Sequence, residues 1–286
     1  MNNLQKQIQE FLATYQADVA KDQFFCIDEQ VLDKMVECAH LTADDRVLEV
    51  GPGLGFLTRK ITPLVKEVLA IEIDERFKPI LDQLPSNVET VYGDAYRLLN
   101  DDIFQSSHLP PFTKTVSSIP YSQAQNMLHN YTNYPWYQGD LVWLAPKSLA
   151  LKVNNEPILG AYFRAEIMMD VPKTAFYPQP NTQSAVIYFH RIAHPTKTGD
   201  LNIFLRRWFY NHEDIKVKNA LREGIISAGK NLKMKTVTKN QAREIIDGLD
   251  LPQDELEKLT SNISPDYYFE LPLKLAPWFE SLTTQS

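Results

Sequence analysis

Three glycines at alternate positions, placed directly after an apolar run, constrain this chain more than any other feature. Residues 47–50 are typical of a buried strand, and they lead into Gly51, Gly53 and Gly55 and then into a helical pattern. Glycine allows a tight turn and a close approach to a ligand, where a Cβ atom would collide. The N-terminus of the following helix offers unpaired N–H groups to an anionic group. The run therefore predicts a strand, a ligand-binding loop and a helix in succession.

The spacing of the loop separates two classes of cofactor. The order is Gly-x-Gly-x-Gly, and Glu49 stands two residues ahead of the first glycine. Enzymes that bind NAD carry Gly-x-Gly-x-x-Gly, so this loop is closer to those that hold S-adenosylmethionine. A second apolar strand, residues 67–74, ends in acids about 20 residues after the loop, where a βαβ unit places a ribose-binding carboxylate. We therefore assign Glu72 to the ribose hydroxyls.

Two further predicted strands also end in residues that can do chemistry. Residues 88–92 lead to Asp94, and residues 115–119 lead to the pair Pro120 and Tyr121. Ligands bind at the carboxyl ends of strands in open α/β sheets. A single acid at such a position is more often a helix cap or a solvated loop residue. Four ordered features on four successive strands instead favour one binding site.

Strand and helix patterns alternate to about residue 130, which predicts an α/β fold with a parallel, doubly wound sheet. Residues 5–40 are expected to be helical, with Asp28 as the cap of one helix. Residues 141–144 form a fifth predicted strand, and residues 184–190 a terminal hairpin strand. Between these two strands, residues 152–169 are interpreted as a loop followed by a short amphipathic helix.

The second half of the chain changes character near residue 194. Residues 194–199 are polar and rich in helix breakers, as a linker would be. Residues 200–286 then show helical periodicity without a convincing strand. We predict two domains, one of residues 1–193 that binds the cofactor and a helical one of residues 200–286.

Composition limits the partners and the compartment. The chain has 286 residues and a net charge of −7, so it shows no overall basic footprint of the kind that nucleic-acid binders carry. No apolar run is long enough to span a membrane, and the N-terminus does not resemble a secretory signal. Cys26 and Cys38 lack metal-ligand spacing, as do the six histidines, so no metal is expected. These features predict a cytoplasmic protein without a membrane partner.

With these residues in view, the chain resembles the rRNA adenine N6-dimethyltransferase family, which includes ribosome-biogenesis dimethylases and macrolide-resistance methylases. The likeness runs from Gln23 and Asp28 through residues 49–58 to a Phe-x-Pro-x-Pro motif at Phe176 and the following Ser184. It implies a Rossmann-like domain that uses S-adenosylmethionine and a small helical domain that docks structured RNA. The cofactor contacts that it implies, together with those assigned above, are Gln23, Glu49, Gly51, Gly53, Gly55, Glu72, Asp94 and Ser118.

The resemblance also implies a catalytic set of Ser118, Pro120, Tyr121 and Phe176. An exocyclic adenine nitrogen is a poor nucleophile because its lone pair is delocalised into the ring, so a catalyst places acceptors on the amino hydrogens and stacks the base. The family uses an Asn or Asp side chain, the carbonyl of the proline and an aromatic ring. Here Ser118 takes the first position, and its hydroxyl is still an acceptor. Tyr121 and Phe176 would stack the flipped base.

Three positions depart from the family pattern. Ser118 replaces the Asn or Asp, Phe24 stands where the family has an Asn that faces the cofactor, and Glu213 with Asp214 replaces an expected basic cluster. The changes fall on catalysis and substrate, while the glycines and Glu72 remain. The leading hypothesis is therefore an S-adenosylmethionine-dependent N-methyltransferase that acts on adenine in rRNA or a pre-ribosomal particle. A relative that methylates a small molecule or a protein, and a non-catalytic RNA- or protein-binding factor, stay open as alternatives, as does the oligomeric state.

Overall fold

The structure is a computed structural model that describes residues 3–14, 23–99, 112–133, 139–192, 201–231, 236–264, 267, 270–271, 273–275 and 277–278. The chain divides into two compact units. The first comprises Met1–Asn154 and Phe163–Arg191, and the second comprises Asn155–Tyr162 and Ile192–Ser286. The segment Asn155–Tyr162 groups with the second unit, which its position in the sequence does not reveal. The predicted domains, 1–193 and 200–286, stay a prediction.

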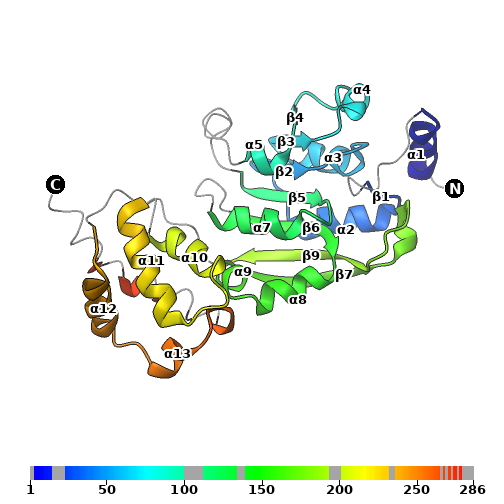
Figure 1. The fold of residues 1–286 in the computed structure, drawn as a ribbon. Coiled ribbons are helices and arrows are strands. Elements are labelled where there is room, and N and C mark those ends of the chain that lie inside the picture. Colours follow the sequence, from blue (N-terminus) through cyan, green and yellow to red (C-terminus); the bar gives the residue numbers. More distant parts are fainter. Residues whose placement is uncertain are drawn as a thin grey trace. The chain divides into compact units, whose positions relative to one another are not determined.

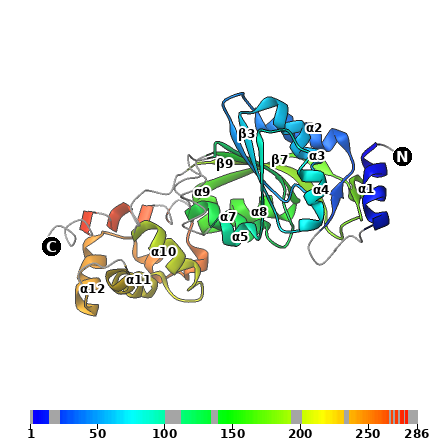
Figure 2. The same cartoon turned by 90° about the horizontal axis from the view of Figure 1, so that it is seen from above.

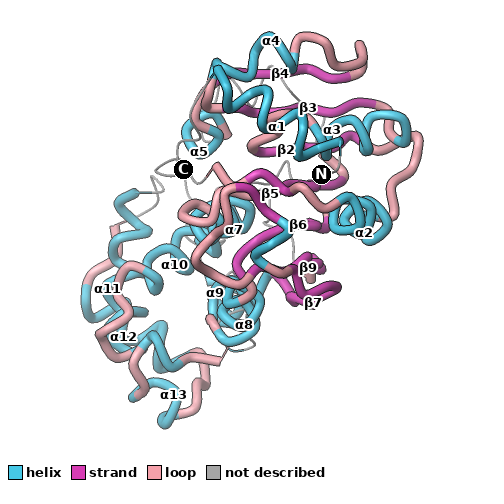
Figure 3. Tube along the Cα trace, turned by 90° about the vertical axis from the view of Figure 1, so that its right-hand side faces the viewer, coloured by secondary structure: helices cyan, strands magenta, loops and turns pink. Residues whose placement is uncertain are grey.

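A seven-stranded sheet forms the centre of the first unit (Figures 1 and 3). Its strands are β2 (Arg46–Val50), β3 (Glu67–Glu72), β4 (Val88–Tyr92), β5 (Lys114–Ser118), β6 (Asp140–Pro146), β7 (Phe163–Val171) and β9 (Ser184–Arg191). They lie in the order β4-β3-β2-β5-β6-β9-β7. Strands β2 to β6 are parallel to one another, and β9 is antiparallel to both β6 and β7. The predicted α/β fold class is confirmed.

Helices cover both faces of this sheet, which explains the continuous apolar runs of its central strands. Figure 3 shows α2 (Glu29–Ala39) and α3 (Phe56–Ile61) on one face, with α5 (Ala95–Leu98) and α7 (Ala124–Asn133) on the other. In the core, Val31 and Met35 of α2 belong to one cluster with Val116 and Val142 of the sheet. Asp28 caps α2 as predicted, because its side chain accepts a hydrogen bond from Gln30 N at 2.9 Å.

The prediction for residues 152–169 is wrong. The segment contains α8 (Ser148–Asn155), α9 (Pro157–Tyr162) and then β7, a strand of nine residues. β7 lies at the edge of the sheet and pairs only with β9, so much of it is exposed. Its register also shifts between Ile167 and Met169. Apolar and polar residues alternate over 163–167, but the register shift breaks this alternation at Met168 and Met169 and leaves the signal short.

The N-terminal region adds one helix and one short strand to the first unit. It contains α1 (Asn3–Thr14) and β1 (Phe25–Cys26), and β1 pairs antiparallel with β8 (Phe176–Tyr177). Residues 5–40 were expected to be helical; α1 and α2 confirm this in part, β1 interrupts it, and residues 15–22 lie outside the described ranges. The short helix α4 (Lys78–Leu81) follows β3. Just before it, the ring of Phe77 stacks on Phe11 of α1 at 4.9 Å.

The second unit is helical over its described residues, as the periodicity predicts (Figure 2). Besides α9, its helices are α10 (Leu201–Tyr210), α11 (Val217–Asn231), α12 (Lys239–Gly248) and α13 (Gln253–Glu257). Buried apolar side chains such as Leu205, Leu221 and Ile225 hold the helices together. Within the described part of the chain, no helix is long and apolar enough to cross a bilayer.

Candidate active site

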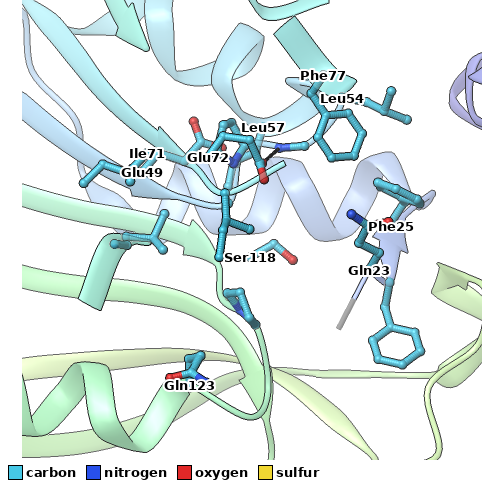
Figure 4. A pocket seen from close by; sticks show the side chains of 18 of the residues that line it. Gln23, Phe25, Glu49, Leu54, Leu57, Ile71, Glu72, Phe77, Ser118 and Gln123 are labelled. Carbon is cyan, nitrogen blue, oxygen red and sulfur yellow. Dashed lines mark hydrogen bonds between the residues drawn. The ribbon is translucent and has the colours of Figure 1, made fainter. Parts of the chain in front are cut away.

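The topology of the sheet marks one place for a ligand. From β2 the chain continues to β3 and β4 on one side, and later returns to β5 and β6 on the other, so the strand order reverses between β2 and β5. Open α/β sheets bind ligands outside the carboxyl ends of the strands at such a point. A cavity of about 300 Å³ lies there, lined by the glycine loop and by residues from the ends of β2, β3, β4 and β5. Figure 4 shows Glu49, Glu72 and Ser118 beside this cavity.

The glycine loop takes a backbone conformation that other residues rarely adopt. Gly51 has φ 72° and Gly53 has φ 53°, both in the left-handed region. The space near Gly53 is large enough for a Cβ atom, which would lie 3.5 Å from the Phe25 ring. The constraint is therefore the backbone angle. This conformation aims the amide of Gly53 at the carboxylate of Glu72, with N to Oε2 at 3.0 Å.

Glu72 ends β3 with its carboxylate held from two sides. Oε2 accepts from Gly53 N at 3.0 Å, and Oε1 accepts from Asp74 N at 2.9 Å. The residue is only 5% exposed, yet it lines the cavity. Burial raises the pKa of Glu72, and these two backbone hydrogen bonds oppose the increase. The carboxylate is thus fixed in orientation at the position where the sequence predicts a ribose contact.

Glu49, in β2, is the most deeply buried acid of the cavity. It is 1% exposed, and burial raises its pKa to about 8, with the nearby charge of Glu72 acting in the same direction. Its Oε2 atom has no hydrogen-bond partner among the described residues. A buried carboxylate oxygen without a donor is costly. A ligand that brings a cation or a donor to this place would remove that cost.

A second row of polar residues lies beside Glu72. Gln23 lines the cavity, and its Nε2 donates to Asp74 Oδ2 at 2.6 Å. Arg76 pairs with the same carboxylate through its guanidinium group and holds the pKa of Asp74 well below its usual range. The arrangement fixes both the Gln23 side chain and the backbone amide that Asp74 gives to Glu72.

Asp94 has a structural task as well as a place in the cavity. It follows β4 and caps α5, because its Oδ1 accepts from Tyr96 N at 2.9 Å. Its side chain is 43% exposed and also lines the cavity. The helix-cap interpretation and the ligand interpretation are therefore compatible at this position.

The predicted catalytic residues divide into two groups. Ser118 and Pro120 line the cavity. The ring of Tyr121 lies behind them, 5.8 Å from the ring of Phe24 and 6.4 Å from that of Phe176, which it meets edge-on. Phe176 is 1% exposed and belongs to the core cluster, so it presents no open face to a base in this structure. The stacking role of both rings stays a prediction.

Sequence reasoning missed several residues that line the cavity. Ile73, Tyr96 and Gln123 are among them. Each stands one or two positions after a predicted site residue; Ile73 and Gln123 lie on turns, and Tyr96 lies in the first turn of α5. The signal that could have found them is this position, because the whole turn at the carboxyl end of a strand faces the same ligand.

The charge of the cavity defines the class of protein. The described residues that line it include three acids, Glu49, Glu72 and Asp94, and they include no Lys or Arg. Such a cavity disfavours the pyrophosphate of a dinucleotide and favours a nucleoside with a positive charge. S-Adenosylmethionine, with its ribose and sulfonium, fits this set of donors and acceptors. The fold and the cavity thus define a Rossmann-like methyltransferase.

Comparison with known proteins narrows the class to one family. The pattern of the family described as ribosomal RNA adenine dimethylase matches residues 19–247. The chain therefore belongs to the ribosomal RNA adenine dimethylase family, as its motifs predict.

Individual relatives agree with this assignment. The chain is 32% identical to ribosomal RNA small subunit methyltransferase A of Listeria welshimeri over 204 residues, which is 64% of this chain and 67% of the relative. It is 30% identical over 258 residues to the probable ribosomal RNA small subunit methyltransferase A of Methanosarcina barkeri, covering 86% and 83% of the two chains. A dimethyladenosine transferase from Plasmodium falciparum shares the fold, with a TM-score of 0.63 and 21% identity over 88% of this chain and 98% of that one.

Proposed function

We propose that the protein transfers methyl groups from S-adenosylmethionine to the exocyclic amino group of adenine in ribosomal RNA. The observation that carries the proposal is the pair of buried carboxylates, Glu49 and Glu72, beside a cavity that no described Lys or Arg lines. Membership of the family and the relatives named for rRNA methylation support the acceptor. The proposal includes a cytoplasmic location and an rRNA or pre-ribosomal partner.

In this proposal the cofactor is held by residues of three strand ends. Glu72 accepts hydrogen bonds from the ribose hydroxyls, and the orphaned oxygen of Glu49 gains a cationic or hydrogen-bonding partner. Asp94 and Gln23 complete the polar lining, and Gly53 lets the loop pass close to the ligand. When bound, S-adenosylmethionine supplies an electrophilic methyl group on positively charged sulfur.

The acceptor side of the site lies after β5. The Ser118 hydroxyl can accept one hydrogen of the adenine amino group. The carbonyl oxygen of Pro120 accepts from Gln123 N at 3.0 Å, and its second lone pair is available for another amino hydrogen. Two acceptors on one amino group keep its lone pair out of the ring and direct it at the methyl. Alignment of this kind can contribute about 7–11 kcal/mol to the lowering of a barrier.

The aromatic rings of Tyr121 and Phe176 have different roles in this proposal. Tyr121 is half-buried and Phe176 is 1% exposed, so of these two rings Tyr121 is the one that we assign to an incoming base. Phe176 supports Tyr121 from behind, and it reaches the base only if Tyr121 or Phe24 moves. Stacking on an aromatic ring contributes about 1–3 kcal/mol per base.

The second unit would help to dock the RNA, and some of its described basic residues are engaged within the protein. Lys216 and Lys218 both form ion pairs with Glu257. Arg206 is 3% exposed and lies over the ring of Tyr162, so it cannot neutralise a phosphate. Other basic side chains of this unit are exposed and can contact phosphates, among them Lys230, Lys239 and Arg243.

The test is transfer of labelled methyl groups from S-adenosylmethionine. Deproteinised rRNA, pre-ribosomal small-subunit particles and a small-molecule extract are offered in parallel at low salt, and labelled RNA is digested to identify N6-methylated adenosine. Cofactor binding is measured separately by calorimetry. Label in the particles supports the proposal, and label only in the extract would overturn it in favour of another acceptor. An absence of cofactor binding would indicate a non-catalytic binding factor.

A further inference from the structure

A hydrogen bond between two hydroxyl groups joins the proposed acceptor site to the start of β9, two strands away from β5. Ser184 is the first residue of β9 and is 2% exposed. It lies opposite Pro146 of β6 and Val171 of β7 in the sheet register. Its Oγ forms a hydrogen bond with the hydroxyl oxygen of Tyr121, 63 positions away in the sequence. A residue in the fixed register of a sheet thus holds a residue on a turn.

Tyr121 needs such an anchor because its own turn does not fix the ring. The residue follows β5 and begins the turn that leads into α7. Its ring packs at a tilt against Phe24, which lines the cavity, and edge-on against the buried Phe176. Ring contacts leave sliding of the ring possible, whereas a hydrogen bond at the distal end of the side chain restrains the position of that end.

We propose that Ser184 is a positioning residue that holds the Tyr121 ring in the place where the acceptor base stacks. The inference rests on the proposed function and extends it in one respect. Because the Tyr121 hydroxyl is engaged by Ser184, the ring and not the hydroxyl of Tyr121 serves the acceptor. Methyl transfer depends steeply on alignment, so a small displacement of the ring lowers turnover while the cofactor cavity stays intact.

The first test is a double-mutant cycle on methyl transfer. Ser184→Ala and Tyr121→Phe each remove the hydrogen bond, and each is expected to lower kcat by about 3- to 10-fold. The double variant is expected to be no worse than either single variant, because the same interaction has already been lost. The affinity for S-adenosylmethionine, measured by calorimetry, should stay within about twofold of that of the unchanged protein.

The matched control is Thr132→Val in α7. Thr132 is 3% exposed, and its hydroxyl donates to His129 O at 2.7 Å, so the variant also loses a buried hydroxyl and its hydrogen bond. It should lower thermal stability as Ser184→Ala does, but leave kcat unchanged. Equal kcat in Ser184→Ala and the unchanged protein would overturn the inference. Additive losses in the double variant would also overturn it.

A second measurement separates this inference from the proposed function. The protein is labelled with 3-fluorotyrosine and studied by fluorine NMR. It has 13 tyrosines, and the signal that disappears in Tyr121→Phe is assigned to Tyr121. The number of components and the line width of this signal should be the same in the unchanged protein and in Thr132→Val, whereas Ser184→Ala should add components or broaden the signal. A signal in Ser184→Ala with the same components and width would refute the positioning role. If the unchanged protein labels no RNA, the proposed function fails, and this measurement still decides whether Ser184 holds the ring.

Discussion

Replacing Glu49 by glutamine is expected to stabilise the ligand-free protein near neutral pH. Glu49 is 1% exposed, and burial raises its pKa from the usual 4.5 to about 8. At pH 7 the carboxyl is therefore protonated in the folded protein and ionised in the unfolded chain. Because the folded state binds the extra proton, the free energy of unfolding falls as the pH rises from about 4.5 towards 8.

The size of the effect follows from the two pKa values. Each pH unit between them corresponds to about 1.4 kcal/mol. At pH 7 the buried carboxyl of Glu49 thus costs about 3 kcal/mol of stability relative to acidic pH. Glutamine has nearly the same shape and does not titrate. The free energy of unfolding of Glu49→Gln should exceed that of the unchanged protein by about that amount at pH 7, and the difference should shrink towards pH 5.

Urea denaturation between pH 5 and pH 8, without cofactor, measures this difference. Glu37→Gln serves as the control, because the Glu37 side chain is 69% exposed and the variant removes an acid without touching the cavity. It should show no gain in stability that grows with pH. A Glu49→Gln variant that is no more stable at pH 7 than at pH 5, relative to the unchanged protein, would refute the reasoning.

Binding of the cofactor is expected to release the proton that Glu49 carries in the ligand-free protein. A positively charged ligand favours the ionised form of Glu49, so binding releases the proton and affinity increases with pH up to about 8. The increase can reach about tenfold per pH unit. An amino group on the ligand titrates in the same range but acts equally on both proteins. The difference between the unchanged protein and Glu49→Gln in calorimetry therefore reports Glu49 alone, and identical pH profiles would contradict its ionisation on binding.

Three further outcomes are expected. Gly53→Val places a β-branched residue at φ 53°, a strain of about 1–3 kcal/mol, and should weaken S-adenosylmethionine binding at least about fivefold by calorimetry. Gly248→Val, at a position with open space around it, is the control and should bind normally. Ser118→Ala should lower turnover more than cofactor affinity, and equal turnover would remove the hydroxyl from the mechanism. Glu257→Gln releases two paired lysines and should steepen the fall of RNA affinity with salt, and an unchanged slope would remove these lysines from RNA binding.

The cofactor half of the site was predictable because its signals are local. The glycines, Glu72 and Asp94 each stand at or just after the end of a strand that the sequence reveals, and the parallel fold brings such strand ends together. Burial on both faces makes the central strands β2 and β3 easy to recognise. Both β4 and β7 are edge strands, but only β7 has a register shift that interrupts its pattern.

The acceptor half of the site depends on contacts between distant segments. The two-residue strands β1 and β8 are too short to recognise, and their pairing joins Phe25 to Tyr177 across 152 positions. The same closure places Phe24 against Tyr121 and Phe176 behind it. Propensity and periodicity carry no information about such pairs. The packed arrangement of the rings, in place of an open stacking slot, could therefore only come from the structure.

The distribution of charge explains how an acidic protein can act on a polyanion. The two acids closest to the proposed cofactor are 1% and 5% exposed, so their charge acts on the ligand in the cavity more than on solvent. The adenine base that would reach Ser118 is neutral, and its phosphates need not enter the cavity. Exposed basic side chains of the second unit, such as Lys230 and Lys239, can contact phosphates outside the cavity, and stacking and shape add to these contacts. An unpaired adenine already exposed on a folded ribosomal particle meets these conditions, because the particle has already supplied the energy for unstacking the base.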